Sequence, residues 1–148
     1  MLIGGPLVRL TPGATGAMAM VLHELTTNAA KYGALSAPGG RVSVRWYRLS
    51  KAGAPATLRL EWREDGGPAV VAPAQAGYGT SVIRDLIPYE IGGRVELEFD
   101  PKGIRCTIEV AVEGDTGHLA ISPAALQSND YASTTDGPGI DQESTTVG

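Results

Sequence analysis

Four segments of the chain alternate apolar with polar residues, and they occur as two pairs. The first pair is "RVSVRWY" at 41–47 and "LRLEW" at 58–62, and the second is "RVELEF" at 94–99 and "IRCTIEV" at 104–110. Such alternation places the apolar side chains on one face of a strand, and the short connection within each pair predicts a hairpin. A sheet with one apolar face needs a second layer, so the chain is restricted to folds that cover that face.

A helical pattern precedes each pair of strands. From Thr11 to Gly33, apolar residues recur every three or four positions, Thr11 supplies a capping hydroxyl, and Pro12 suits the first helical turn. Gly33 is a typical helix stop. A second helix is predicted at 81–91, "SVIRDLIPYEI", with an interruption near Pro88.

The order of these elements predicts the fold class. A further short strand is expected at 6–10, "PLVRL". The elements that follow it have the order α-β-β-α-β-β, which predicts an α+β protein with the helices on one face of a mixed β-sheet. We expect a two-layer sandwich, because this arrangement buries both the apolar helix stripes and the apolar sheet face.

The composition changes near residue 113. Residues 1–112 contain all twelve basic residues and ten acidic ones, a net charge of +2, whereas residues 113–148 contain six acidic and no basic residues. The second part is also rich in Ser, Thr, Gly and Pro, which is typical of a linker or a disordered tail. We therefore predict one domain at 1–112 and an acidic tail or linker at 113–148.

Composition also limits which kinds of partner and which cellular location we expect. A net charge of +2 on the body is too small for a nucleic-acid-binding face. The single cysteine, Cys106, excludes a disulfide framework, and the longest apolar run, Ala17 to Leu22, is far shorter than the roughly 20 residues of a membrane span. With no signal-peptide pattern, the expectation is a cytoplasmic protein that binds neither membrane nor nucleic acid.

The first predicted helix carries an unusual polar stripe. At about 100° per residue, Asn28 lies about 40° around the axis from Glu24, and Lys31 lies about 20° to the other side. The Asn28 amide oxygen suits Mg²⁺, the Lys31 ammonium suits a phosphate, and Glu24 suits a general base or a water-holding carboxylate. The alternative is an ordinary solvated face with i,i+4 support.

Two glycine-rich stretches follow this stripe. "EWREDGGP" at 61–68 ends a predicted strand, and "GYGTS" at 77–81 opens a predicted helix. Glycines let backbone amides approach a ligand, and a helix N-terminus favours phosphate. The conjunction of a polar helix stripe, an acid-x-Gly-Gly strand end and a Gly-x-Gly helix start favours a nucleotide site over a solvated face.

The same stretches resemble the sensor histidine kinases. Their N box is similar to "HELTTNAAKYGALS" at 23–36, and the first glycine box of the HWE-type subgroup is similar to "WREDGGP" at 62–68. The second glycine box is similar to "GYGT" at 77–80, and the closing hairpin to "EIGGRVELEFDPKGIRCTIEV" at 90–110. The resemblance covers roughly residues 4–112. It implies the Bergerat-type ATP-binding fold shared with gyrase, heat-shock chaperone and mismatch-repair ATPases.

The subgroup is named for a histidine in the N box and a Trp-x-Glu in the glycine box, which stand here as His23, Trp62 and Glu64. Each has an ordinary alternative that stays open at this point. His23 is also explained as a surface imidazole on the helix, and Trp62 is also explained as a core residue.

The resemblance implies a role for each matching residue. Asn28 matches the Mg²⁺-binding asparagine, Glu24 the acidic residue that holds water or assists the transfer, and Lys31 the basic residue near the phosphates. The ATP-lid hinge on the phosphate side matches Gly77, Gly79 and the adjoining Thr80. ATP and Mg²⁺ are therefore the implied ligands.

The base side of the implied site involves four more positions. Glu64 matches the carboxylate that accepts from the adenine amino group, and Tyr32 matches the aromatic residue that borders the adenine. Gly66 and Gly67 match the glycines that let the base approach. The similar box "DGPGI" at 136–140 is rejected, because it follows no apolar strand and comes after the second glycine box.

The sequence departs from the pattern of ordinary histidine kinases in two respects, both of which fit the HWE-type subgroup. The two glycine boxes are separated only by residues 69–76, so the implied lid is short. The single phenylalanine, Phe99, lies in a predicted strand, so the phenylalanine box is missing. No dimerisation helices with a phospho-acceptor precede Gly4, and the two histidines are His23 and His118. The implied function is to bind Mg-ATP and supply its γ-phosphate to a histidine on the dimerisation domain of a parent kinase.

A response regulator is then an indirect partner in two-component signalling. Two alternatives remain from the residues alone. One is a degenerate module of this fold that docks a response regulator without nucleotide, and the other is a hydrolytic ATPase of the same superfamily. The second would be recognised by sustained ATP turnover by the isolated chain.

Overall fold

Five strands form one mixed sheet, and two helices cover one of its faces. The computed structural model describes residues 1–75 and 77–114, all of which lie in the compact unit Met1–Gly117. The strands are β1 (Leu2–Gly4), β2 (Arg41–Leu49), β3 (Thr57–Asp65), β4 (Arg94–Asp100) and β5 (Gly103–Ala111). The helices are α1 (Pro12–Lys31), the short 3₁₀ helix η1 (Ala34–Ser36) and α2 (Tyr78–Ile91).

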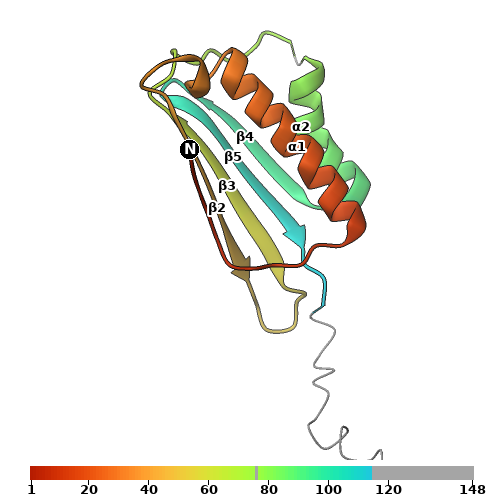
Figure 1. Cartoon of the computed structure of the whole chain (residues 1–148). Coiled ribbons are helices and arrows are strands. Elements are labelled where there is room, and N and C mark those ends of the chain that lie inside the picture. The colour runs from red at the N-terminus through yellow and green to blue at the C-terminus, as the bar shows by residue number, and fades with distance from the viewer. Residues whose placement is uncertain (76, 115–148) are drawn as a thin grey trace, which may run out of the picture. The chain divides into compact units, whose positions relative to one another are not determined.

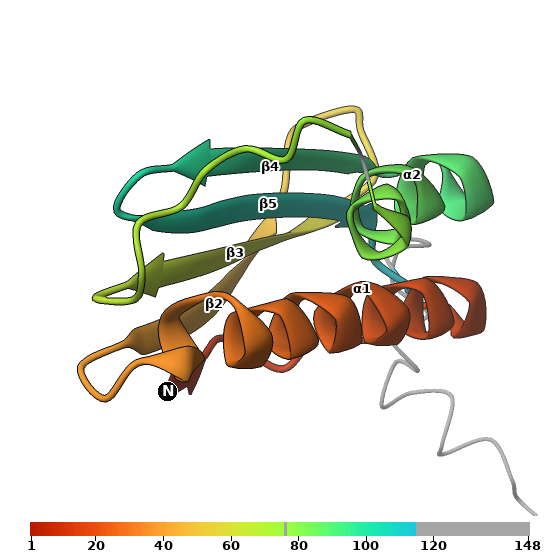
Figure 2. The same ribbon diagram turned by 90° about the horizontal axis from the view of Figure 1, so that it is seen from above.

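The strand order in the sheet is β1-β2-β3-β5-β4. β1 runs parallel to β2, and the other neighbours are antiparallel. Figure 1 shows α1 and α2 next to each other to the right of the sheet, and Figure 2, from above, shows both helices on the same side of it. The predicted two-layer α+β sandwich and both hairpins are confirmed.

The short strand predicted at 6–10 is wrong. The edge strand is β1, and residues 6–10 pair with no strand, although Val8 and Leu10 pack against the core while Leu7 is exposed. The alternation therefore reflects burial without a hydrogen-bonded ladder. Pro6 has no N–H to contribute to a ladder, and its carbonyl instead accepts from the Trp46 indole at 2.7 Å.

Helix α1 begins as predicted. The Thr11 Oγ1 accepts from the Ala14 N–H at 3.2 Å, and Pro12 is the first helical residue. The helix ends at Lys31, and Gly33, which was expected to act as the stop, has a negative φ of −109°. The reason for a glycine at position 33 is therefore spatial, and it becomes apparent at the functional site.

The interruption predicted at Pro88 is also wrong, because α2 runs without a break to Ile91. Pro88 is exposed and lies in the last turn of the helix, where it removes one helical hydrogen bond, to the carbonyl four residues earlier, without ending the helix. The true end is Gly92, whose left-handed φ of 67° and N–H to the Pro88 carbonyl form a glycine cap.

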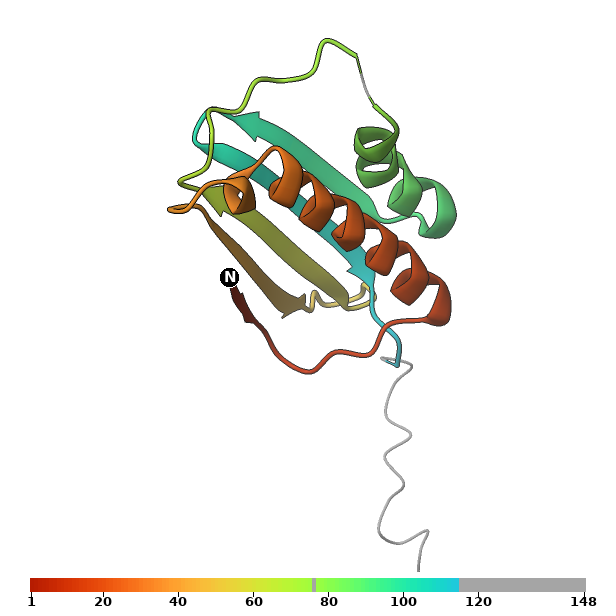
Figure 3. The ribbon, with the colours of Figure 1, turned by 45° about the horizontal axis from the view of Figure 1, so that its top comes forward.

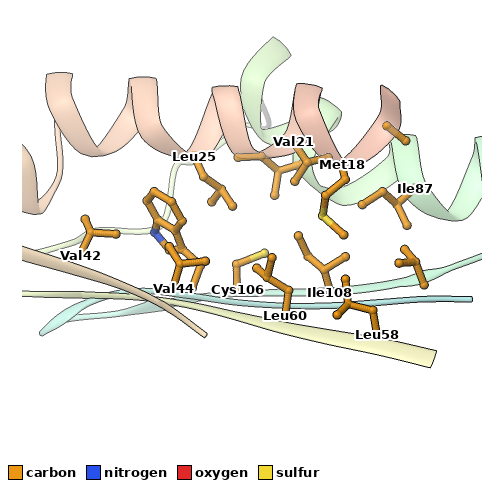
Figure 4. Close-up of a cluster of buried hydrophobic side chains, with 14 of the residues drawn as sticks. Met18, Val21, Leu25, Val42, Val44, Leu58, Leu60, Ile87, Cys106 and Ile108 are labelled. Atoms are coloured by element: carbon orange, nitrogen blue, oxygen red, sulfur yellow. The ribbon is translucent and has the colours of Figure 1, made fainter. Parts of the chain in front are cut away.

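The core lies between the two layers. Figure 4 shows Val21 and Leu25 of α1 directed toward the sheet, where they meet Leu60 of β3 and Ile108 of β5. All four are at most 5% exposed, and each such side chain contributes about 1.5–3 kcal/mol by burial. Within the described residues, no helix is long and apolar enough to span a bilayer.

The single cysteine belongs to this core. Cys106 is 1% exposed, and burial raises the pKa of its thiol to about 12. The thiolate, which is the reactive form, is therefore strongly disfavoured near neutral pH.

The chain remains bonded to the domain for two residues beyond β5. Val112 N–H donates to the Ala56 carbonyl at 3.1 Å, and Glu113 N–H donates to the Arg9 carbonyl at 3.0 Å. Residues 115–148, including nearly all of the predicted tail, lie outside the described residues, so the division into domain and tail stays a prediction.

We expect a chain that ends at Gly114 to keep the melting temperature of the full chain, because it retains both hydrogen bonds. A chain that ends at Ala111 should lose about 1–3 kcal/mol of unfolding free energy, since two backbone bonds disappear. Thermal and urea denaturation of the three chains measures both effects. A clear loss for the Gly114 chain would place part of 115–148 in the domain.

Candidate functional site

A cavity of about 620 Å³ opens between α1, α2, the segment 69–75 and the ends of β4 and β5. Figure 3 shows the segment that connects β3 with α2 passing along this end of the molecule. The wall combines an apolar part with a few polar groups. Its lining includes Leu25, Asn28, Tyr32, Glu64, Val70, Val71, Gly77, Gly79, Thr80, Ile83, Leu97, Phe99 and Ile104.

The Glu64 carboxylate is the buried polar group of this wall. The residue is 1% exposed, and both carboxylate oxygens accept hydrogen bonds. Oε2 accepts from the Ala34 N–H at 2.9 Å, and Oε1 accepts from the Trp62 indole N–H at 3.0 Å. Burying a carboxylate costs several kcal/mol unless donors replace water, and these two N–H groups supply that replacement.

The neighbouring acid, Asp65, lies on the opposite side of the sheet. Successive residues of a strand point to opposite faces, so Trp62 and Glu64 face the helices, whereas Asp65 faces away from them. Its carboxylate pairs with Arg105 at 2.8 Å, and this hydrogen bond lowers the pKa of Asp65. Arg105 also donates to the Glu64 carbonyl at 3.2 Å, which fixes the backbone at the end of β3.

Glycines bring the chain close around Glu64. A Cβ at Gly33 would collide with the Glu64 carboxylate, and this collision explains the residue type at position 33. A Cβ at Gly67 would lie 2.6 Å from the Ala34 Cα, and Gly66 has a left-handed φ of 75°. Gly66 and Gly67 are not part of the cavity wall, because they pack the end of β3 against the 33–40 loop.

The polar stripe of α1 meets the first turn of α2. A Cβ on Gly79 would lie 2.7 Å from the Glu24 carboxylate and 3.8 Å from the Asn28 Oδ1. The α2 N-cap residue, Gly77, offers no side-chain hydrogen bond, so the first N–H groups of α2 remain available to an anion. A cradle of free amides beside an amide oxygen and a carboxylate fits a phosphate chain with Mg²⁺.

Three curated proteins with similar sequences have related names. Blue-light-activated histidine kinase 1 of Erythrobacter litoralis is 37% identical over 111 residues, which are 73% of this chain and 29% of that protein. The blue-light-activated histidine kinase of Brucella anthropi is 35% identical over 100 residues, 68% and 20% of the two chains. The blue-light-activated histidine kinase of Rhizobium johnstonii is 32% identical over 116 residues, which are 78% of this chain and 32% of that protein.

The chain belongs to the histidine kinase catalytic domains. It is homologous to the HWE-type, blue-light-activated kinases, and it spans about a fifth to a third of the length of the curated relatives it matches. No protein-family model matches the chain. The resemblance of its boxes to the HWE-type subgroup is thereby confirmed.

Solved structures support the same fold. The histidine kinase domain of the Erythrobacter litoralis blue-light-activated kinase matches with a TM-score of 0.56 and 18% identity, over 74% of this chain and 50% of that one. The mycobacterial sensor histidine kinase MprB matches with a TM-score of 0.50 and 22% identity, over 74% and 82%. At these identities the likeness shows the fold alone.

The remaining predicted site residues of this histidine kinase domain occupy varied positions. Tyr32 and Thr80 line the cavity, whereas Lys31 is exposed at the last turn of α1 and is not part of the wall. His23 is exposed on α1. His118 and the rejected box at 136–140 lie outside the described residues.

Several functional features were not predicted from the sequence. The apolar wall includes Leu97 and Phe99, whose alternation on β4 was a usable signal, because it places both on the helix-facing side. The Ala34 N–H left no signal, since any residue type supplies a backbone donor. Trp62 is buried, as a core residue would be, and it is also a donor to Glu64.

Within residues 1–75 and 77–114, no cluster of three or more His, Cys, Asp or Glu side chains is placed to hold a metal ion by itself. Glu24 and Asn28 therefore offer a partial donor set. Such a set is usual for Mg²⁺, which keeps several waters and takes oxygens from a bound phosphate.

Proposed function

We propose that this histidine kinase domain binds Mg-ATP and supplies its γ-phosphate for autophosphorylation of a histidine in two-component signal transduction. The observation that carries the proposal is the buried Glu64 carboxylate, held by two N–H donors in the wall of a cavity of about 620 Å³. A buried acceptor beside an apolar wall is suited to a flat base that carries an amino group.

Glu64 accepts from the exocyclic amine of adenine in this proposal. Guanine presents an oxygen at the corresponding position, so a carboxylate there opposes it. Tyr32 borders the base, while Leu97 and Phe99 provide apolar contact. Gly66 and Gly67 serve the base indirectly, because they hold the end of β3 against the 33–40 loop that supplies the Ala34 donor.

The phosphates lie toward the first turn of α2. The N–H groups around Gly77 and Gly79, together with the Thr80 hydroxyl, donate to phosphate oxygens, and the positive end of the helix dipole favours their charge. Asn28 supplies the protein oxygen for Mg²⁺, which neutralises phosphate charge when it is bound. Lys31 contributes a positive charge from the rim of the site.

Glu24 lies on the same stripe, one helical turn before Asn28. Its carboxylate is next to Gly79, so it holds water or assists the proton transfer when the acceptor approaches. The acceptor is a histidine on the dimerisation domain of the parent kinase, and the response regulator receives the phosphoryl group afterwards. Phosphoryl transfer depends mainly on positioning, so the isolated chain should bind ATP better than it transfers phosphate.

The first prediction concerns the base. Glu64→Ala should weaken ADP binding by about 1–3 kcal/mol, because the adenine amine loses its buried acceptor. Asp65→Ala is the matched control, since that carboxylate faces away from the helices and pairs with Arg105. Calorimetric titration with ADP measures the difference. An equal loss from Asp65→Ala, or from Asp136→Ala, would show that the wrong carboxylate has been assigned.

The second prediction concerns the metal. Asn28→Ala should remove the enhancement of ATP affinity by Mg²⁺ while the unliganded domain keeps its melting temperature. Thr26→Ala, on another face of the same helix, should leave that enhancement unchanged, since the Thr26 hydroxyl donates to the Leu22 carbonyl of its own helix. Titrations with ATP in the presence of Mg²⁺ or of a chelator measure both. Persistence of the enhancement in Asn28→Ala refutes the assignment.

The third prediction concerns phosphoryl transfer. Incubation of the chain with γ-labelled ATP should give no acid-labile label on the protein, because His23 lies on α1 itself and cannot reach the γ-phosphate in line. Addition of the parent kinase's dimerisation helices should produce label on their histidine. Strong phosphohistidine on the isolated chain would contradict the proposed missing acceptor, and rapid phosphate release would favour the hydrolytic ATPase.

A further inference from the structure

Trp62 is the residue of the site whose role neither the cavity nor the comparisons explain. It is 2% exposed on β3, and its indole N–H donates to Glu64 Oε1 at 3.0 Å. The chain has one other tryptophan, Trp46 on β2, which donates to the Pro6 carbonyl at 2.7 Å. Both indole rings pack against other residues, but of the two tryptophans it is Trp62 that donates its N–H to a carboxylate in the cavity wall.

The Glu64 carboxylate needs a fixed position to act as a selective acceptor. A glutamate has one more rotatable side-chain bond than an aspartate, so its carboxylate reaches more positions unless contacts restrict it. Here the Trp62 indole holds one oxygen and the Ala34 amide holds the other. The absence of a Cβ at Gly33 leaves just enough room for this arrangement.

We propose that Trp62 is a positioning residue that makes Glu64 selective for a 6-amino purine. This inference rests on the proposed function. Because each carboxylate oxygen has two lone pairs, Glu64 is still able to accept from the base while it is held by Trp62 and Ala34. Without the indole N–H, Oε1 loses its hydrogen-bond donor, and the carboxylate turns toward other donors. The defined position of the acceptor oxygen is then lost.

Base preference separates this role from ordinary packing. A core residue that merely stabilises the domain affects binding of all purine nucleotides to a similar degree. A residue that positions the acceptor affects adenine more than hypoxanthine, which has a 6-oxo group in place of the amine. The ratio of the dissociation constants for IDP and ADP therefore reports positioning.

The test compares Trp62→Phe with Trp46→Phe in the full chain, after thermal denaturation has shown that each variant is folded. Both changes keep an aromatic ring and remove one indole N–H. We expect Trp62→Phe to lower the IDP/ADP ratio about tenfold, which is the effect of one hydrogen bond to a charged group. Trp46→Phe should keep the ratio of the unmodified chain. Equal ratios for the two variants would overturn the inference.

A double variant tests whether Trp62 acts through Glu64. In a Glu64→Ala background, Trp62→Phe should have no further effect on the ratio, because the group that it positions is missing. An undiminished effect in that background overturns the inference. If the unmodified chain binds ADP and IDP equally or binds neither, the proposed function itself fails, and this inference fails with it.

A second replacement keeps the test decisive if Trp62→Phe does not fold. In the Trp46→Phe background, Trp62 is the only tryptophan, so biosynthetic incorporation of benzothienylalanine changes that residue alone. This analogue matches the indole in shape and has sulfur in place of the N–H. A lower IDP/ADP ratio than in Trp46→Phe supports the positioning role, and an unchanged ratio refutes it.

Discussion

The buried carboxylate of Glu64 is the constraint on which the rest of the structure depends. A carboxylate that is 1% exposed must receive hydrogen bonds from the protein, and its donors come from β3 and from the loop after α1. The Ala34 donor thus joins the segment after α1 to the end of β3 at the cavity, whereas the Trp62 donor comes from the same strand as Glu64. Removal of either donor would leave this carboxylate with one partner in a place that water reaches poorly.

Several other features follow from this constraint. Gly33 leaves space for the carboxylate, Gly67 lets the end of β3 approach Ala34, and a Cβ at Gly103 would collide with the Glu64 carbonyl. Arg105 holds that carbonyl and the Asp65 side chain from the other face. The glycines of the first box therefore determine how closely the backbones pack, and the position of the Glu64 carboxylate in the cavity wall results from that packing.

The sequence predicted a structural feature best when the cause of that feature lay in the pattern of nearby residues. Alternation and helical spacing predicted the hairpins, the layers and the start of α1, because burial on one face leaves a periodic record. The same alternation misassigned 6–10, where Val8 and Leu10 are partly buried without strand pairing. Pro88 misled because the loss of one helical hydrogen bond does not end α2, which continues to its cap at Gly92.

The residues of the candidate site were likewise predicted only in part. The helical stripe placed Glu24 and Asn28 together, and the structure brings both to the first turn of α2. Lys31 does not line the cavity, because α1 and its C-cap contribute Leu25, Asn28 and Tyr32 to the wall, and at about 100° per residue Leu25 and Tyr32 lie on the other side of Asn28 from Lys31. The Ala34 donor depends on three-dimensional approach, which leaves no periodic signal, whereas Trp62 and Glu64 share one face of β3 because they are two residues apart.

The burial of Cys106 has a practical consequence for spectroscopy. Because this thiol is the only one in the chain and its pKa is raised to about 12, maleimide or iodoacetamide reagents should leave it unmodified in the folded domain. A cysteine introduced into the segment 69–75 would then carry a fluorophore or spin label alone. The native sequence thus already serves as a labelling background for following how that segment responds to nucleotide.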